Sequence, residues 1–187
     1  MELFDVVDEN DNIIKTGLRE DELHVNNDIT RVVTIYIYDR EGKFRISQRV
    51  ATKKVDPLKF EAPAHGRVSS GEEYLEAAKR EIKEELGVEP YSILEVAKFK
   101  TKFDTNIGIR QHRDALYIAF VKDEIKYNRE EINSIKEFDS YEEYREYYSN
   151  HLEEFSDAIK FGINELDKFF SSKENRRKVE LELEKRS

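Results

Sequence analysis

Several residue types are scarce or missing in this chain of 187 residues: it has no cysteine, no tryptophan, one methionine, three prolines and seven glycines. Because cysteine is absent, disulfides, thiolate metal ligands and a cysteine nucleophile are excluded. No apolar run approaches the roughly 20 residues of a membrane-spanning helix, and the acidic start is unlike a secretory signal peptide. We therefore expect a cytoplasmic protein that does not contact a membrane.

The motifs of several common enzyme classes are missing as well. The sequence contains no glycine-rich phosphate loop, no nucleophile elbow and no zinc-ligand spacing. Its formal net charge is −9, from 41 acidic and 32 basic residues. This charge argues against a binder of nucleic-acid polymers or of anionic membranes, since both require positive charge. A phosphorylated small molecule stays open as a substrate, because a bound metal would reverse the local sign.

The residues that are present suffice for a folded domain with a substantial core. Apolar residues make up 38% of the chain, and 10 Tyr and 11 Phe supply large apolar surfaces. Strands and helices are mixed rather than strictly alternating, which indicates an α/β or α+β fold with a mixed sheet. The expected strands cover residues 2–7, 13–16, 31–38, 43–49, 93–103, 115–121 and 132–138, and the expected helices cover residues 141–148 and 155–170.

The C-terminal part of the chain changes in character after Asp139. Residues 173–187 are mostly charged, and we expect them to form a solvated, fraying helix after a break at Ser171 and Ser172. One apolar stripe runs along the helix expected just before that break. Its members are Phe155, Ile159, Ile163, Leu166 and Phe170.

The most informative stretch spans residues 66–88 and follows the spacing G-x5-E-x7-R-E-U-x-E-E-x-G-U, in which U is an apolar residue. A chance match to all of these positions is on the order of 10⁻⁷ or less per starting point. A solvated, glutamate-rich helix is the alternative interpretation. The fixed positions are Gly66, Glu72, Arg80, Glu81, Glu84, Glu85 and Gly87.

Local physical chemistry predicts a helix within this stretch. Ser70 and Glu73 have the spacing of a capping box at a helix start. Gly87 stands where a helix needs a residue that tolerates the left-handed conformation, so the helix is expected to stop there. The residues expected to face the core from one stripe are Leu75, Ala78, Ile82 and Leu86.

Three carboxylates lie on another face of the same helix. Glu81, Glu84 and Glu85 stand at positions i, i+3 and i+4, where like charges repel by roughly 0.2–0.5 kcal/mol per neighbouring pair. A hard divalent cation such as Mg²⁺, which binds carboxylates, waters and phosphates, would neutralise them. Arg80 lies four residues before Glu84 and could hold that side chain in place.

With every specified position filled, the stretch resembles the signature of the Nudix family. The resemblance implies the Nudix fold, a mixed β-sheet sandwiched between helices, for residues 1–170, with extra C-terminal helices and a charged helical tail at residues 171–187. It also implies an enzyme, a pyrophosphohydrolase acting on acid anhydrides. Such enzymes use Mg²⁺ or Mn²⁺ to cleave the diphosphate linkage of a nucleoside diphosphate derivative or a similar small pyrophosphate compound.

The resemblance also implies roles for single residues. Glu81, Glu84 and Glu85 are the expected metal ligands, and the expected catalytic residues are Glu81, Glu84 and Arg80. Glu81 is the candidate for orienting or activating the attacking water. Arg80 is expected to orient the acids, and Glu72 to support Arg80 through an ion pair.

The predicted substrate-binding residues are His65, Arg49, Arg67 and His112. His65 is adjacent to Gly66 and could touch phosphate or metal, with a structural hydrogen-bonding role as the alternative. Arg49 precedes a polar loop and could steer an anionic substrate. His112 lies in a basic cluster beside an expected strand. For both of these residues an ordinary solvated loop is the alternative.

The flanking sequence, beginning with residues 2–14, resembles the branch of the family that includes isopentenyl-diphosphate isomerase. That isomerase has a catalytic cysteine beside the first signature glycine and a metal-binding histidine before the arginine of an early strand. Here His65-Gly66-Arg67 and Thr30 stand at these places. A hydrolase is therefore favoured over an isomerase. It is also favoured over a non-catalytic module that binds a nucleotide or protein, because such modules usually lose one of the acids. A homodimer is left open.

Overall fold

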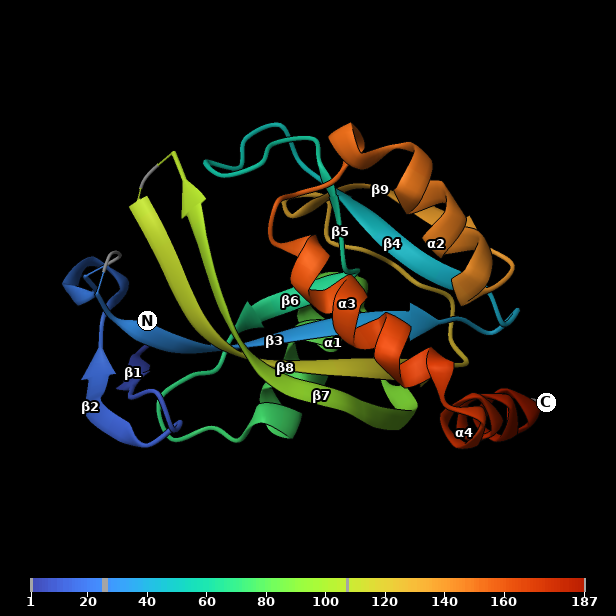
Figure 1. Cartoon of the computed structure of the whole chain (residues 1–187), viewed down its shortest axis with the longest axis horizontal. Helices are drawn as coiled ribbons and strands as arrows, with labels where there is room; N and C mark the ends of the chain where they lie inside the picture. Colours follow the sequence, from blue (N-terminus) through green and yellow to red (C-terminus); the bar gives the residue numbers. More distant parts are fainter. Residues whose placement is uncertain (1, 25–26, 107, 187) are drawn as a thin grey trace.

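A ten-residue strand, β3 (Ile29–Tyr38), organises the sheet of this protein. One edge of β3 pairs over its whole length with β8 (Gly108–Val121) in parallel, from Ile29 opposite Gln111 to Tyr38 opposite Phe120. The other edge is shared in turn by β1 (Phe4–Val7), β6 (Ala64–Arg67) and β4 (Phe44–Arg49), all antiparallel. Both β3 and β8 therefore have neighbours on both sides and form the centre of the molecule (Figure 1).

The computed structural model describes residues 2–24, 27–106 and 108–186, and this part of the chain contains one mixed sheet of nine strands. Within it, the two predicted strands at the start of the chain pair with each other as a hairpin, and β8 pairs with a long antiparallel partner. β4 pairs along one edge with a seven-residue strand and, beside β3 on its other edge, with a two-residue strand. These outer strands are β2 (Ile13–Leu18), β7 (Pro90–Thr105), β5 (Phe60–Glu61) and β9 (Ile132–Phe138).

Helices cover both faces of the sheet, so the predicted sandwich with additional C-terminal helices is confirmed (Figure 1). One core lies between α1 and the sheet, and a second lies between the sheet and the pair α2 and α3. Among the described residues, none of the helices combines the length and apolarity that crossing a bilayer requires. The helices are α1 (Tyr74–Leu86), α2 (Tyr141–Asn150), α3 (Ile159–Ser171) and α4 (Lys173–Glu184), with short 3₁₀ turns η1 (Glu20–Glu22) and η2 (Leu152–Glu154).

The start of α1 differs from the prediction. The N-cap is Glu73, which forms its capping box with Glu76, and Ser70 lies outside the helix. Ser70 Oγ instead donates a 2.6 Å hydrogen bond to Oδ1 of Asp5 in β1. This hydrogen bond joins the loop before α1 to the first strand, and Glu73 takes the capping position in place of Ser70.

The apolar stripe of α1 is buried at Ala78, Ile82 and Leu86, each 0% exposed, as predicted. The prediction for Leu75 is wrong, since this side chain is 43% exposed. Tyr74 occupies the core position in the first helical turn, where it is 7% exposed and its hydroxyl contacts Asp11.

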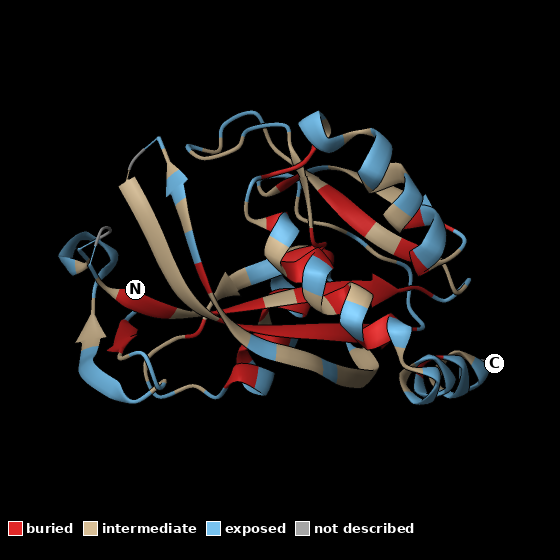
Figure 2. Ribbon diagram, viewed as in Figure 1, coloured by how far each residue is buried: buried red, intermediate tan, exposed pale blue. Residues whose placement is uncertain are grey.

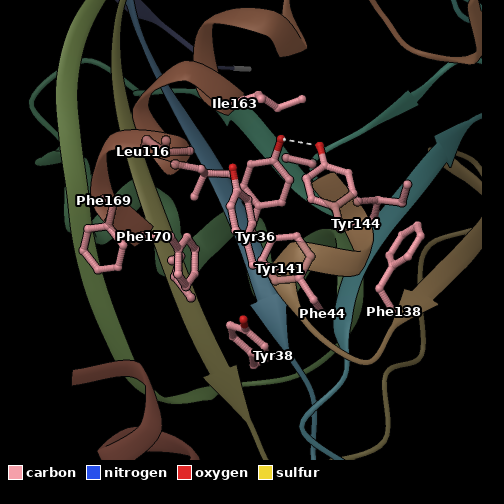
Figure 3. Close-up of a cluster of buried hydrophobic side chains, with 14 of the residues drawn as sticks. Tyr36, Tyr38, Phe44, Leu116, Phe138, Tyr141, Tyr144, Ile163, Phe169 and Phe170 are labelled. Atoms are coloured by element: carbon pink, nitrogen blue, oxygen red, sulfur yellow. Dashed lines mark hydrogen bonds between the residues drawn. The ribbon is translucent and has the colours of Figure 1, made fainter. Parts of the chain in front are cut away.

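The core under α2 and α3 is built largely from aromatic rings (Figure 3). Phe44 stacks on Tyr144 at 5.1 Å between ring centroids, and Tyr141 stacks on Phe170 at 4.2 Å. The hydroxyls of Tyr36 and Tyr144 lie 3.3 Å apart and share a hydrogen bond inside this core. Aromatic pairs of this kind contribute beyond their buried area, which explains how a chain with few aliphatic residues stabilises its fold.

All five residues of the predicted stripe at 155–170 are buried. The helix itself begins later than predicted, at Ile159, because the chain around Phe155 is extended and bridges to Phe60. The N–H of Ser156 donates to the carbonyl of Phe60, which holds this segment against β5. The break after Ser171 is confirmed, and Ser172 caps the next helix.

Helix α4 was expected to be fully solvated, and one of its faces is packed instead. Val179 is 4% exposed and belongs to the second core, whereas Leu181 on another face is 42% exposed. The hydroxyl of Tyr91 donates a 2.8 Å hydrogen bond to the carbonyl of Glu182. The outer surfaces of α2 and α4 remain exposed (Figure 2).

The packing of α4 can be tested with Val179→Ala. We expect the free energy of unfolding to fall by about 1–3 kcal/mol, because the substitution removes two buried methyl groups and leaves a void. Leu181→Ala is the matched control on the exposed face and should change stability by less than about 0.5 kcal/mol. Urea denaturation measures both, and equal effects of the two substitutions would show that α4 is not docked.

Candidate active site

The acids of the signature lie on the second half of α1, which ends as predicted. Gly87 adopts a left-handed conformation with φ 67°, and its N–H donates to the carbonyl of Lys83. A side chain at this position would also meet the carbonyl of Lys126 at 2.9 Å. The helix therefore stops at Gly87 for two reasons, the backbone conformation and the close approach of the following loop.

Arg80 connects the acidic face of α1 to the loop before the helix. Its Nε and Nη2 each donate to a carboxylate oxygen of Glu72 at 3.0 Å, and Nη2 also donates to the carbonyl of Arg67 at 2.9 Å. Its Nη1 donates to Glu81 at 2.7 Å and to Glu84 at 3.3 Å. The predicted contacts of Arg80 with Glu84 and with Glu72 are thus both present.

Gly66 in β6 lies directly against Glu81. A Cβ atom at Gly66 would overlap the carboxylate of Glu81, which is only 8% exposed. On the same strand the N–H of His65 donates to Oε2 of Glu85 at 3.3 Å. The glycine of the signature is therefore required so that the strand backbone can approach the carboxylates of α1.

The carboxylates in this region carry more negative charge than their surroundings neutralise. Burial raises the pKa of Glu85 well above its usual range, and the charges of Glu61 and Glu81 raise it further. Burial also raises the pKa of Glu81, although Arg80 acts in the opposite direction. Such mutual repulsion indicates a site that is suited to an additional cation.

The donor set fits a hard divalent metal ion by its chemistry. It consists of carboxylate oxygens on one helical turn, beside a glycine that keeps space for them. Within residues 2–24, 27–106 and 108–186, no three Asp, Glu or His side chains are gathered around one point. Instead, Glu81 and Glu84 turn toward the guanidinium group of Arg80.

A cavity of about 370 Å³ opens beside these acids. All four predicted substrate-binding residues line it, together with Glu85 from α1. The side chains of Glu81, Glu84 and Arg80 lie outside the lining. The four residues come from three strands and are Arg49 of β4, His65 and Arg67 of β6, and His112 of β8.

Several basic residues of the lining are already held by acids. Arg49 Nη1 contacts both oxygens of Glu61 at 2.6 and 2.7 Å, and Arg67 contacts Glu20 at 3.1 Å. These pairs fix the guanidinium groups at the wall of the cavity, where their remaining N–H groups are available to an anion.

His112 is a neutral side chain at this wall. Burial, together with the nearby charges of Arg67 and Arg110, lowers the pKa of His112 to about 3. Its Nδ1 lies 3.0 Å from Oγ1 of Thr30. His112 therefore acts at neutral pH through hydrogen bonding and not through charge.

The inner wall contains polar residues that the sequence analysis missed. Asp114 is 9% exposed and Thr101 is 3% exposed, and Thr34 Oγ1 donates to Asp114 at 3.2 Å. Burial raises the pKa of Asp114 to about 7. The alternation of Arg110, His112 and Asp114 was the available signal, because residues at i, i+2 and i+4 of a strand share one face.

The predicted strand at 115–121 is correspondingly too short. The structure extends β8 back to Gly108, through residues whose composition is polar. Polar side chains are tolerated there because one face of this part of β8 borders the cavity and not the apolar core.

The chain matches one family model and several curated proteins. The family model described as NUDIX domain matches residues 28–159. An uncharacterized Nudix hydrolase of Yersinia pestis is 36% identical over 99 residues, which cover 53% of this chain and 54% of that protein. The chain thus spans about half the length of the curated relatives it matches.

Two solved structures share the fold at low sequence identity. A crystal structure of a Deinococcus radiodurans protein has a TM-score of 0.64 and 24% identity, covering 80% of this chain and 90% of that one. The NUDIX domain of Shewanella oneidensis NrtR, solved with ADP ribose, has a TM-score of 0.55 and 11% identity, covering 80% and 92%.

The burial of Asp114 predicts a pH-dependent stability. The pKa rises from the ordinary 3.8 in the unfolded chain to about 7 in the fold, so the unfolded state loses its proton first. The stability that this group contributes below about pH 4 is lost as the pH rises to 7. We expect Asp114→Asn to match the wild type near pH 4 and to be more stable at pH 8, by up to about 4 kcal/mol.

Denaturation of the wild type and Asp114→Asn between pH 4 and pH 8 measures this difference. Asp104→Asn, at an exposed position of β7, removes the same charge and should follow the wild type at every pH. A stability difference between Asp114→Asn and the wild type that does not change with pH would contradict the interpretation.

Proposed function

The chain belongs to the Nudix family, and from that premise we propose that it is a metal-dependent hydrolase that cleaves the diphosphate linkage of a nucleoside diphosphate derivative or a similar small pyrophosphate compound. One observation carries the proposal. Glu85, on the acidic turn of α1, lines the same cavity as Arg49 and Arg67. Acids that suit a divalent cation and cations that suit phosphate thus border one space.

Mg²⁺, or Mn²⁺ in its place, would be held by Glu81, Glu84 and Glu85. When bound, such an ion screens the diphosphate charge, makes phosphorus more electrophilic and makes water more nucleophilic. The chain itself contributes the orientation of the acids. Arg80 fixes Glu81 and Glu84 through its fork of N–H groups, and Glu72 fixes Arg80 from the opposite side.

The substrate would lie in the cavity with its phosphates toward the basic wall. The guanidinium groups of Arg49 and Arg67 can donate further hydrogen bonds to phosphate oxygens. His65 and His112 complete this wall as hydrogen-bonding groups. ADP ribose, the compound bound by the Shewanella oneidensis domain, contains a diphosphate linkage of this kind and is the first substrate to assay.

The residues of the chain favour hydrolysis over isomerisation and over ligand binding without catalysis. The sequence has no cysteine to serve an isomerase. A module that only binds its ligand has no need of Glu84, whose side chain is 55% exposed and makes its contact with Arg80. The intact acidic face is therefore best explained by catalysis.

We expect Glu84→Gln and Glu85→Gln each to lower kcat/KM by about 100-fold or more, because each replaces a charged oxygen ligand with a neutral amide. Turnover of ADP ribose in Mg²⁺, followed by chromatography of the products, measures the loss. Glu89→Gln alters an exposed glutamate just beyond the helix and is the control, with activity close to wild type. Full activity in both of the first two variants would refute the roles of Glu84 and Glu85.

Removal of divalent ions gives an independent test. We expect EDTA to abolish turnover and added Mg²⁺ to restore it. Calorimetric titration of the metal-free protein should detect Mg²⁺ uptake, and Glu85→Gln should weaken it about 10-fold or more. Turnover that persists in EDTA, together with no heat of binding at millimolar Mg²⁺, would exclude the metal-dependent mechanism.

A further inference from the structure

Polar atoms at the inner end of the cavity lack partners in the protein. Oδ1 of Asp114 and Oγ1 of Thr101 are fully buried and make no hydrogen bond to any described residue. The other carboxylate oxygen of Asp114 accepts only the hydroxyl of Thr34. Buried polar atoms are nearly always paired in proteins, so two unpaired atoms beside one cavity require an explanation.

The charge of Asp114 also lacks a partner. Two other acids of the lining are paired with cations, Glu61 with Arg49 and Glu131 with Lys53. No lysine, arginine or histidine among the described residues forms an ion pair with Asp114. A buried carboxylate without a counter-charge destabilises the fold and is characteristic of functional sites.

The strand β8 carries Asp114 together with basic residues that line the same cavity. Arg110, His112 and Asp114 follow one another on the same face of the strand and all line the cavity. At a rise of about 3.3 Å per residue, Arg110 and Asp114 are separated by roughly 13 Å along the strand. Asp114 thus lies farther along β8 from Arg110 than His112 does, and Thr101 of β7 is the cross-strand partner of His112.

We propose that Asp114 and Thr101 form a recognition subsite for a hydroxyl or amino group of the substrate, in the buried part of the cavity lining. The inference rests on the proposed diphosphate hydrolase. Asp114 accepts a hydrogen bond from the substrate group, and the Thr101 hydroxyl donates or accepts a second one. Thr34 holds the carboxylate in position.

Hydrogen-bond donors fit this subsite better than the other ligand chemistries do. An apolar ligand group would leave the buried carboxylate without a hydrogen-bond partner. A site of this kind therefore rejects apolar groups strongly. A metal ion would find a single carboxylate there, that of Asp114, beside the hydroxyls of Thr34 and Thr101. The two sources of a neutral donor are a sugar hydroxyl and an amino group of a base.

Equilibrium binding with matched nucleotide pairs distinguishes these sources. The first comparison, the amino arm, measures binding of GDP against IDP, which lacks the exocyclic amino group. The second, the hydroxyl arm, measures binding of ADP against 2′,3′-dideoxy-ADP, which lacks both ribose hydroxyls. Calorimetry is carried out on the full chain in EDTA, so that hydrolysis does not interfere.

We expect the wild type to prefer the donor-bearing member of at least one arm by about 10-fold or more. Asp114→Asn should reduce that ratio by about 10-fold, and Thr101→Val, which keeps the side-chain shape, should reduce it less. Asp104→Asn, the exposed control on β7, should leave the ratio unchanged. The arm that responds identifies the donor.

Three results would overturn the inference: no probe binds, both members of each pair bind equally, or Asp114→Asn keeps the wild-type ratio. Hydrolysis assays in Mg²⁺ separate these failures from failure of the proposed function. Turnover of diphosphate compounds with an unchanged ratio in Asp114→Asn refutes this inference alone. Selective binding that depends on Asp114, without turnover at any Mg²⁺ concentration, refutes the hydrolase alone.

Discussion

The guanidinium group of Arg80 is the contact on which the acidic site depends. It donates to Glu72 and to the carbonyl of Arg67 on one side, and to Glu81 and Glu84 on the other. One loop residue, the end of β6 and two helical carboxylates are thereby fixed relative to each other. Without this cation the carboxylates would repel one another and turn toward solvent. Arg80 thus keeps Glu81 facing β6, where any side chain at Gly66 would overlap the carboxylate of Glu81.

The parallel pairing of β3 with β8 imposes the second constraint. Alternate residues of β8 face opposite sides, so Ala115 and Tyr117 enter the core under α1 while Asp114 faces the cavity. The same alternation places Thr34 beside Asp114 and Val33 in the core. One strand pair therefore supplies both stability and recognition, and a shift of register by one residue would exchange the two faces.

Local patterns in the sequence predicted the parts of the site that are local in structure. The helix stop at Gly87 and the two predicted contacts of Arg80, with Glu84 and Glu72, join residues no more than eight positions apart. Ser70 was misassigned because its partner, Asp5, is 65 positions away. The alternation in β8 could have placed Asp114 on the face of Arg110 and His112, but its contact with Thr34 spans 80 positions. Pairings between strands that are distant in sequence decide such contacts, and no short pattern encodes them.

Two acids that line the cavity share one energetic property. Glu85 and Asp114 are acids whose pKa is raised because burial disfavours their charge. Neither has a salt bridge among the described residues, so the folded protein carries this destabilisation by itself. The aromatic core around Tyr144, on the far side of the sheet from α1, contributes part of the free energy that offsets it. A ligand that supplies positive charge to Glu85 and hydrogen-bond donors to Asp114 would remove the destabilisation, and its binding would therefore stabilise the fold.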